Sequence, residues 1–503
     1  MTTNTLTSPE RPTFGVEVEF VIATLRTDAV DPDADVEGLP PVLRVPNTFD
    51  GGGDIYLHEY TVGKVRELLQ ECFGSELVVN PKSVMDHYRD WGVGQDESVH
   101  AKNIRPYIFV SVEVSSPVQF SSPKGFDAIS LAISTITSKF RCLVNFSCGL
   151  HVHVGLGAER LSLEQIRRIG SLSYAAESLL FTLHDPIRRV TQYCRPLQDY
   201  SRLADNLEQQ DLEIEIPHAN EEFKFGLSGR NECYRYLGRD RRHGEAPMSA
   251  RDERVDEAHI EAFLETRQSG HFEPFTEPGD PRHTKLLLPD VCDELASRIS
   301  AVRLASSTTP PAEQARQRNI PRLRLPKFKS TELLSMRSKI RLWGLAVPEE
   351  TILDLEKRGP VPSVFEATER IYSQLASDYV SELLSGFDRP AISLASYECL
   401  ALTSERVLRT IEFRLGEGSL DSEWISTWAK ICVGFFKFAL YSSPGQFIDV
   451  LTNCDRAMKD DGSYDVIDLL DDIGLFAEAE IAERRLTANK DRWNLTFVES
   501  ESS

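Results

Sequence analysis

The chain has 503 residues, of which 41% are hydrophobic and 27% are charged, and this composition is typical of a soluble globular protein. Its formal net charge is −22 at pH 7, which argues against general nucleic-acid binding because affinity for a phosphate backbone comes mainly from lysine and arginine. A single cleft can still bind a nucleotide, since local arginines and a bound metal ion reverse the field there.

No targeting or membrane signal is evident along the chain. Residues 1–11 are polar, and we expect them to be disordered. The sequence has no run of about 18 apolar residues, so neither a membrane span nor secretion is expected. The 9 cysteines form no Cys-x-x-Cys pair, which favours a reducing, cytoplasmic compartment over a disulfide framework or a structural zinc site.

The first predicted strand covers residues 14–20, where Glu17 and Glu19 alternate with Val16 and Val18. Because a strand has a period of two residues, both carboxylates lie on one face and the valines on the other. Exposed strands often carry glutamates, so the pair alone is weak evidence for function. On a buried strand, however, two adjacent carboxylates repel each other unless a cation lies between them.

A second strand of the same kind is predicted over residues 107–115. Ser111, Glu113 and Ser115 lie on one face of it, and valines and isoleucine lie on the other. Antiparallel sheets commonly bury one face and expose the other to solvent, so their strands alternate apolar and polar residues. Strands of parallel sheets are buried on both faces and have continuous apolar sequences. The sequence therefore predicts an α+β fold.

Two histidines share one face of a third predicted strand, residues 149–155. His151 and His153 alternate with valines there. They could be ordinary hydrogen-bonded histidines, or metal ligands. Two imidazoles favour zinc, whereas the carboxylates elsewhere favour magnesium or manganese. A helix is predicted to follow over residues 163–184, with Ser162 and Gln165 as its capping box.

Two long segments differ from the rest of the chain. Residues 205–341 are charged and rich in proline, and we interpret them as an insertion or a mobile lobe. Their basic run, residues 316–329, is interpreted as a solvated face in preference to a contact with an acidic substrate. Residues 441–503 are expected to form a helical, acidic C-terminal extension.

The last predicted strand, residues 411–415, places Glu412 and Arg414 on one face. They could form a simple cross-strand charge pair. The following helix, over residues 424–439, has Asp421 or Ser422 as its candidate N-cap. The chain shows no glycine-rich phosphate loop of the common types, so phosphate would have to be held by metal ions and arginines.

In this order, residues 14–20, 149–155 and 410–415 resemble the glutamine synthetase and glutamate-cysteine ligase superfamily, most closely its amidoligase branch. Further matches are residues 91–98, residues 112–117 and Tyr397. The resemblance implies a glutamine synthetase-like catalytic domain over residues 12–440. Its curved antiparallel sheet, backed by helices, would form one wall of a funnel that admits nucleotide at one end and the carboxylate substrate at the other.

The resemblance also implies a set of metal ligands. Glu17 and Glu19 would hold magnesium, and Glu113 would add a further ligand. His151 and Glu412 would hold the metal ion that bridges the phosphates of ATP. The implied cofactors are therefore ATP and Mg²⁺ or Mn²⁺.

Four more residues receive expected roles from the same resemblance. Arg414 would face the transferred phosphoryl group, and together with Glu113 and Asp96 it completes the expected catalytic set, in which Asp96 orients the amine. His153 and Arg189 would lie near the nucleotide, as would Arg414.

The expected activity is that of an ATP-dependent carboxylate–amine ligase that forms an amide bond through an acyl phosphate. Its partners would be a small-molecule or peptide carboxylate and an amine, with no nucleic acid and no membrane, and the oligomeric state stays open. Two alternatives remain: a metal-dependent hydrolase that uses the histidine pair, and a catalytically silent binding protein on the same fold.

Overall fold

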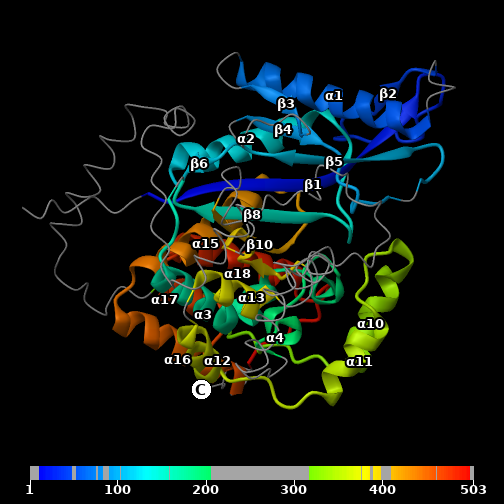
Figure 1. Ribbon diagram of the computed structural model, residues 1–503. Coiled ribbons are helices and arrows are strands. Elements are labelled where there is room, and N and C mark those ends of the chain that lie inside the picture. Colours follow the sequence, from blue (N-terminus) through cyan, green and yellow to red (C-terminus); the bar gives the residue numbers. More distant parts are fainter. Residues whose placement is uncertain are drawn as a thin grey trace, which may run out of the picture.

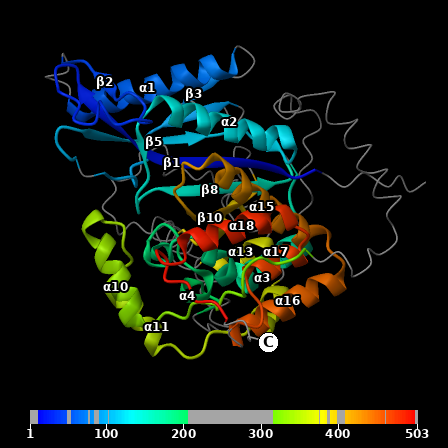
Figure 2. The same ribbon diagram turned by 180° about the vertical axis from the view of Figure 1, so that it is seen from behind.

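A computed structural model of the protein describes residues 11–47, 53–74, 78–82, 90–101, 103–157, 159–204, 316–374, 376–385, 389–397, 409–459 and 462–498. A large mixed sheet crosses the molecule, with helices α1 and α2 beside its first strands and a larger group of helices beyond β10 (Figures 1 and 2). The expectation of an α+β fold is confirmed in this form. Most of residues 205–341, the expected insertion, lie outside the described residues.

The described part of the chain contains a 10-stranded sheet with the order β3-β4-β5-β1-β8-β10-β9. Its strands are β1 (Thr13–Arg26), β2 (Leu43–Val45), β3 (Val79–Pro81), β4 (Trp91–Gly94), β5 (Ile108–Ser115), β6 (Gln119–Phe120), β7 (Cys142–Leu143), β8 (Gly149–Gly155), β9 (Ile392–Ser393) and β10 (Thr410–Glu417). Most pairs are antiparallel, but β1 pairs with β2 and β3 pairs with β4 in parallel. The sheet is therefore mixed but mostly antiparallel, where an antiparallel sheet was expected.

The described helices are α1 (Gly53–Phe73), α2 (Pro123–Lys139), α3 (Leu163–Leu180), α4 (Leu197–Tyr200), α10 (Ser330–Ile340), α11 (Glu349–Lys357), α12 (Val364–Ser373), α13 (Ser377–Ser385), α15 (Ser422–Tyr441), α16 (Pro444–Lys459), α17 (Val466–Asp472) and α18 (Phe476–Asn489). Helices α1 and α15 contact strands of the sheet directly, α2 packs against both of these helices, and α3 packs against α15. No helix in the described part of the chain is both long and apolar enough to cross a membrane.

Strand β1 shows why the sheet has two different faces. Val16, Val18, Phe20 and Ile22 are almost fully buried in the main hydrophobic core, on the side that the helices cover. The residues between them point to the opposite face, where Glu17 lies. Burial of the apolar face fixes the register of β1, because a slip by one residue would turn every buried valine outward.

The predicted helix boundaries are largely confirmed. Ser162 forms the expected capping box with Gln165 at the start of α3. That helix ends at Leu180, and the chain continues as a 3-10 turn to Leu183, so the predicted single helix to residue 184 was slightly too long. The carboxylate of Asp421 caps α15 by accepting hydrogen bonds from two backbone N–H groups of its first turn.

The basic run that begins at Arg316 meets the acidic C-terminal helices. Arg316 pairs with Glu483 at 2.9 Å, and Arg318 pairs with Asp465. Both arginine side chains are mostly buried, so the interpretation of this run as a solvated face was wrong at these two positions. The C-terminal helices α16, α17 and α18 also contribute residues to the main hydrophobic core.

A mostly buried ion pair joins α18 to the end of strand β10. Arg485 Nη2 lies 2.5 Å from Glu417 Oε1, and the guanidinium stacks 4.1 Å from the ring centre of Trp424. We expect Arg485→Met to lower the free energy of unfolding by about 3 kcal/mol, because Glu417 keeps a buried charge without its main partner. The shift is measured by urea unfolding followed by circular dichroism.

Arg484, the neighbouring residue, supplies the matched control. It pairs with Glu423 at 3.0 Å, but both side chains are more than half exposed. Exposed pairs contribute about 0–1 kcal/mol, so Arg484→Met should leave the urea midpoint nearly unchanged. Equal shifts in the two variants would show that α18 is not held to β10 by Arg485.

Candidate functional site

Four neighbouring strands bring their polar residues together on the face of the sheet opposite the helices. Glu17 of β1 lies directly opposite His151 of β8, and Glu19 lies opposite Glu113 of β5. His153 lies opposite Glu412 of β10. Pairs that are remote in the sequence thus become neighbours because β1, β5, β8 and β10 are adjacent in the sheet.

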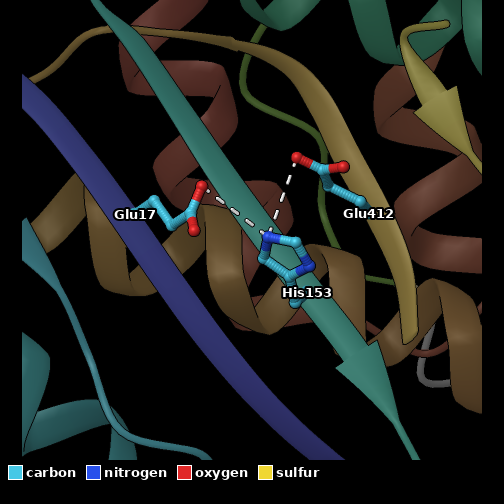
Figure 3. A group of neighbouring side chains, drawn as sticks. All are labelled: Glu17, His153 and Glu412. Carbon is cyan, nitrogen blue, oxygen red and sulfur yellow. Dashed lines mark ion pairs between the residues drawn. The ribbon is translucent and has the colours of Figure 1, made fainter. Parts of the chain in front are cut away.

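Glu17, His153 and Glu412 form a first group, drawn in Figure 3. Each offers one ligand atom, and the three atoms lie within 4.8 Å of one another. His153 Nε2 is 3.7 Å from Glu17 Oε2 and 3.7 Å from Glu412 Oε1. These separations are too long for hydrogen bonds, and Nε2 is buried without a hydrogen-bond partner among the described residues. His153 Nδ1, on the other side of the ring, is held 3.2 Å from Thr410 Oγ1.

His151 lies between this group and a second one. Its Nδ1 is 3.4 Å from Glu17 Oε2 and 3.8 Å from Glu412 Oε1, while its Nε2 is 3.9 Å from Glu19 Oε1. The described geometry thus places His153, the residue expected near the nucleotide, in the same group as Glu17 and Glu412. His151, the expected metal ligand, touches members of both groups.

Glu19, Asp96 and Glu113 form the second group, again with one ligand atom each within 4.8 Å. Glu19 Oε2 accepts a 2.7 Å hydrogen bond from the backbone N–H of Gly149. Asp96 comes from the loop after β4 and accepts a 2.6 Å hydrogen bond from the backbone N–H of Ser98. Glu113 is almost fully buried, and its Oε2 has no hydrogen-bond partner in the described structure.

The electrostatics of this face show an excess of negative charge. Burial, followed by repulsion from Glu17, raises the pKa of Glu113 to about 8. Burial likewise raises the pKa of Glu19. Burial opposes the ionisation of Glu17 as well, but the neighbouring imidazoles of His151 and His153 favour its charged form and hold its pKa well below the usual value. A further cation would relieve the repulsion that these buried carboxylates experience.

Arg414 borders the first group. Its Nη2 lies 2.8 Å from Glu412 Oε1, so its ion pair is within β10 and not across to a neighbouring strand. The pairing of β10 with β8 shifts register between Phe413 and Gly416, next to Arg414. Arg188 Nη2 donates a 2.8 Å hydrogen bond to the backbone carbonyl oxygen of Arg414 and so fixes this bulged stretch.

Arg189 is the one expected site residue whose contacts lead elsewhere. It pairs with Asp199 at 3.2 Å and stacks over the ring of Phe181 at 4.9 Å, and none of its described contacts reaches either group. Its neighbour Arg188 faces β10 instead. Consecutive residues of the 3-10 turn Pro186–Val190 point in different directions, so the sequence did not show which arginine faces the sheet.

Lys82 was not predicted at all. It follows β3 and forms an ion pair with Glu113. Burial opposes the charge of Lys82, but the negative charge of Glu113 raises its pKa above the usual value, so it stays protonated. No sequence pattern marks it, because it lies in a short stretch of mixed residues whose partner is 31 positions away along the chain.

Comparison with known proteins gives a match to a protein family. Residues 10–216 match the model of a family described as "Putative amidoligase enzyme". The matched region contains β1, β5 and β8, and therefore both glutamates of β1, Asp96, Glu113 and both histidines; β10 follows outside it. No curated protein matches the chain, and no solved structure does.

Proposed function

We propose that this protein, which carries an amidoligase-family domain over residues 10–216, is an ATP-dependent carboxylate–amine ligase on a glutamine synthetase-like sheet. The observation that carries the proposal is the pair of acidic groups on one sheet face, the first of which contains His153 and is bordered by Arg414. Such a surface suits phosphoryl transfer, in which catalysis rests mainly on positioning and charge neutralisation.

The residues present fit a divalent cation at two places. Two atoms that bind one octahedral Mg²⁺ at about 2.1 Å lie roughly 3 Å apart when they are adjacent and roughly 4.2 Å apart when they are opposite. His153 Nε2 is 3.7 Å from both carboxylates of its group, so small side-chain shifts would bring the three ligand atoms onto one cation. We assign Glu17, His153 and Glu412 to a first cation, and Glu19, Asp96 and Glu113 to a second, with His151 between them. Bound Mg²⁺ or Mn²⁺ would neutralise the phosphate charge of ATP.

The proposed reaction has two steps. A carboxylate oxygen of the substrate attacks the γ-phosphorus of ATP, the bond to the β–γ bridging oxygen breaks, and ADP leaves. The nitrogen of the amine then attacks the acyl carbon, the bond between carbon and the phosphate oxygen breaks, and phosphate and a proton are released. Arg414 is placed to hold the phosphoryl oxygens with its planar fork of donors. Asp96, which is only partly buried, is assigned the additional role of orienting the amine.

A covalent mechanism finds no support at this face. Cys148 lies next to the histidine strand, but it is 1% exposed and burial raises the pKa of its thiol to about 12. A thiol in this state is not a nucleophile at neutral pH. A ligase that relies on cations and an arginine needs no such residue, so the residue types of the site favour the ligase over a hydrolase with a covalent intermediate.

ATP consumption is expected to depend on a carboxylate and an amine supplied together. An acyl phosphate held in a closed site is attacked by the bound amine faster than by water, because the site holds the amine in line and excludes solvent. The test pairs acidic amino acids and acidic peptides with ammonia, amino acids and polyamines. ADP release and product mass are recorded with Mg²⁺ and with Mn²⁺, and hydrolysis of the same compounds is recorded with Zn²⁺ in the absence of nucleotide.

Two variants make this assay specific. Glu412→Gln should abolish amine-dependent ADP release, whereas Glu423→Gln, which changes a mostly exposed glutamate of α15, should retain it. A product whose mass equals that of the carboxylate substrate plus the amine minus one water supports the ligase. Steady ADP release that no amine accelerates would identify an ATPase. Nucleotide-independent hydrolysis with zinc would favour the metal hydrolase, and no turnover with any pairing would favour the binding protein.

A further inference from the structure

Lys82 occupies an unusual position at the edge of the second group. It follows β3, which pairs in parallel with β4, yet its ammonium reaches across to Glu113 on β5. The Lys82 side chain is 35% exposed, whereas that of Glu113 is 1% exposed. One partner is therefore fixed in the core of the sheet, and the other has room to move away.

Gly94 makes this reach possible. It lies in β4 directly opposite Glu113, between Lys82 and its partner. A Cβ atom at position 94 would lie 2.7 Å from the Cβ of Lys82, closer than such atoms approach in proteins. The stem of Lys82 thus crosses β4 at Gly94, where no side chain blocks it. This close approach is a second observation, independent of the ion pair, that β4 accommodates Lys82.

Lys82 and a divalent cation would use the same carboxylate. Glu113 Oε1 already accepts two hydrogen bonds, one from the ammonium group of Lys82 and one of 3.1 Å from Ser115 Oγ. Its Oε2 is buried and has no hydrogen-bond partner in the described structure. Glu19 and Asp96 complete a set of three carboxyl groups, and Lys82 forms its ion pair with one of them, Glu113.

We propose that Lys82 is a tethered counter-ion of Glu113 that competes with the divalent cation for the group Glu19, Asp96 and Glu113. The inference rests on the proposed function, because it assumes that this group binds a cation. Cation binding displaces the ammonium, and the displaced ammonium is then free to pair with an anionic group of the bound substrate, such as a phosphate. The second cation and an anionic ligand should accordingly bind with positive cooperativity.

The test measures Mn²⁺ binding by calorimetry and by electron paramagnetic resonance, with the full chain and without substrates. In Lys82→Met the second, weaker class of Mn²⁺ sites should bind about tenfold more tightly, while the first class changes little. Gly94→Ala should give the same shift, because the added methyl group moves Lys82 off Glu113. The double variant should show no further gain, since both changes act on one contact.

Lys64→Met is the control for net charge. Lys64 pairs with Glu67 on α1, so this substitution removes the same charge from a surface ion pair. The Mn²⁺ affinities of Lys64→Met should equal those of the wild type. Adding inorganic phosphate should tighten the second class in the wild type and in Lys64→Met, but less in Lys82→Met.

The outcomes separate the two proposals. If the wild type binds no Mn²⁺, the proposed cation sites fail and the role of Lys82 fails with them. Two classes of sites that are unchanged in Lys82→Met would overturn only the role of Lys82. Weaker binding of the second class in Lys82→Met would show that the lysine supports the group structurally, and it too would overturn the competition. Circular dichroism establishes that each variant is folded, and Lys82→Met does not depend on the folding of Gly94→Ala.

Discussion

Replacing Glu17 with glutamine is expected to weaken binding of the tighter class of Mn²⁺ by about 100-fold. Loss of a residue that merely supports a ligand costs 10–100-fold in metal affinity, so loss of a charged ligand should reach the upper end of that range. Glu17 lies 3.7 Å from His153 and 3.4 Å from His151, and it belongs to the group with Glu412. The affinity is measured by calorimetry with the purified full chain.

The fold should tolerate this change. Glutamine has nearly the same shape as glutamate, and it removes a negative charge from a face where carboxylates repel one another. Glu67→Gln, at an exposed position of α1, serves as the control and should bind Mn²⁺ as the wild type does. If Glu17→Gln and Glu67→Gln have equal affinities, the group of Glu17, His153 and Glu412 does not hold the tighter cation.

Arg414→Lys is expected to reduce kcat tenfold or more while KM for ATP changes less. Lysine keeps the charge but loses the planar fork of donors, and a tenfold loss corresponds to about 1.4 kcal/mol of transition-state stabilisation. The guanidinium of Arg414 is held 2.8 Å from Glu412 and its backbone is fixed by Arg188, so the fork has a defined orientation. Steady-state kinetics with the carboxylate and amine found in the substrate panel measure both constants.

Arg484→Lys is the matched change on the surface, because Arg484 and its partner Glu423 are mostly exposed. The kcat and KM of this variant should equal the wild-type values. Mn²⁺ affinity provides a second readout for Arg414→Lys, and it should change little, because the charge beside Glu412 is retained. Normal turnover in Arg414→Lys would mean that Arg414 is only a structural charge partner of Glu412.

Local periodicity made most of the polar face predictable. Glu17 and Glu19 share a face because a strand repeats every two residues, and the same holds for the histidines of β8. The N-caps at Ser162 and Asp421 were also predictable, because capping depends on side chains within three or four positions. These features depend on neighbours in the chain, so the sequence alone contains them.

Contacts between segments that are distant in the sequence were harder to predict from the sequence. The arginines at the start of the basic run could have faced solvent or a substrate, but they pair with acids of α17 and α18. Of two consecutive arginines, the structure turns Arg188 to β10 and Arg189 to Asp199. In each case several partners of suitable charge exist in the sequence, and only the packing of whole helices and strands selects one of them.

The sequence by itself determined that an acidic and histidine-bearing face exists and which strand residues lie on it, and most of that face lies within residues 10–216, which match the amidoligase family model. Only the tertiary structure decided how these residues divide into two groups, since that depends on strand order and on the register between strands. It also placed Lys82 across Gly94 onto Glu113. The physical reason is that strand periodicity is a local property of the backbone, whereas register and partner choice are set by burial of the opposite, apolar face against helices from the whole chain.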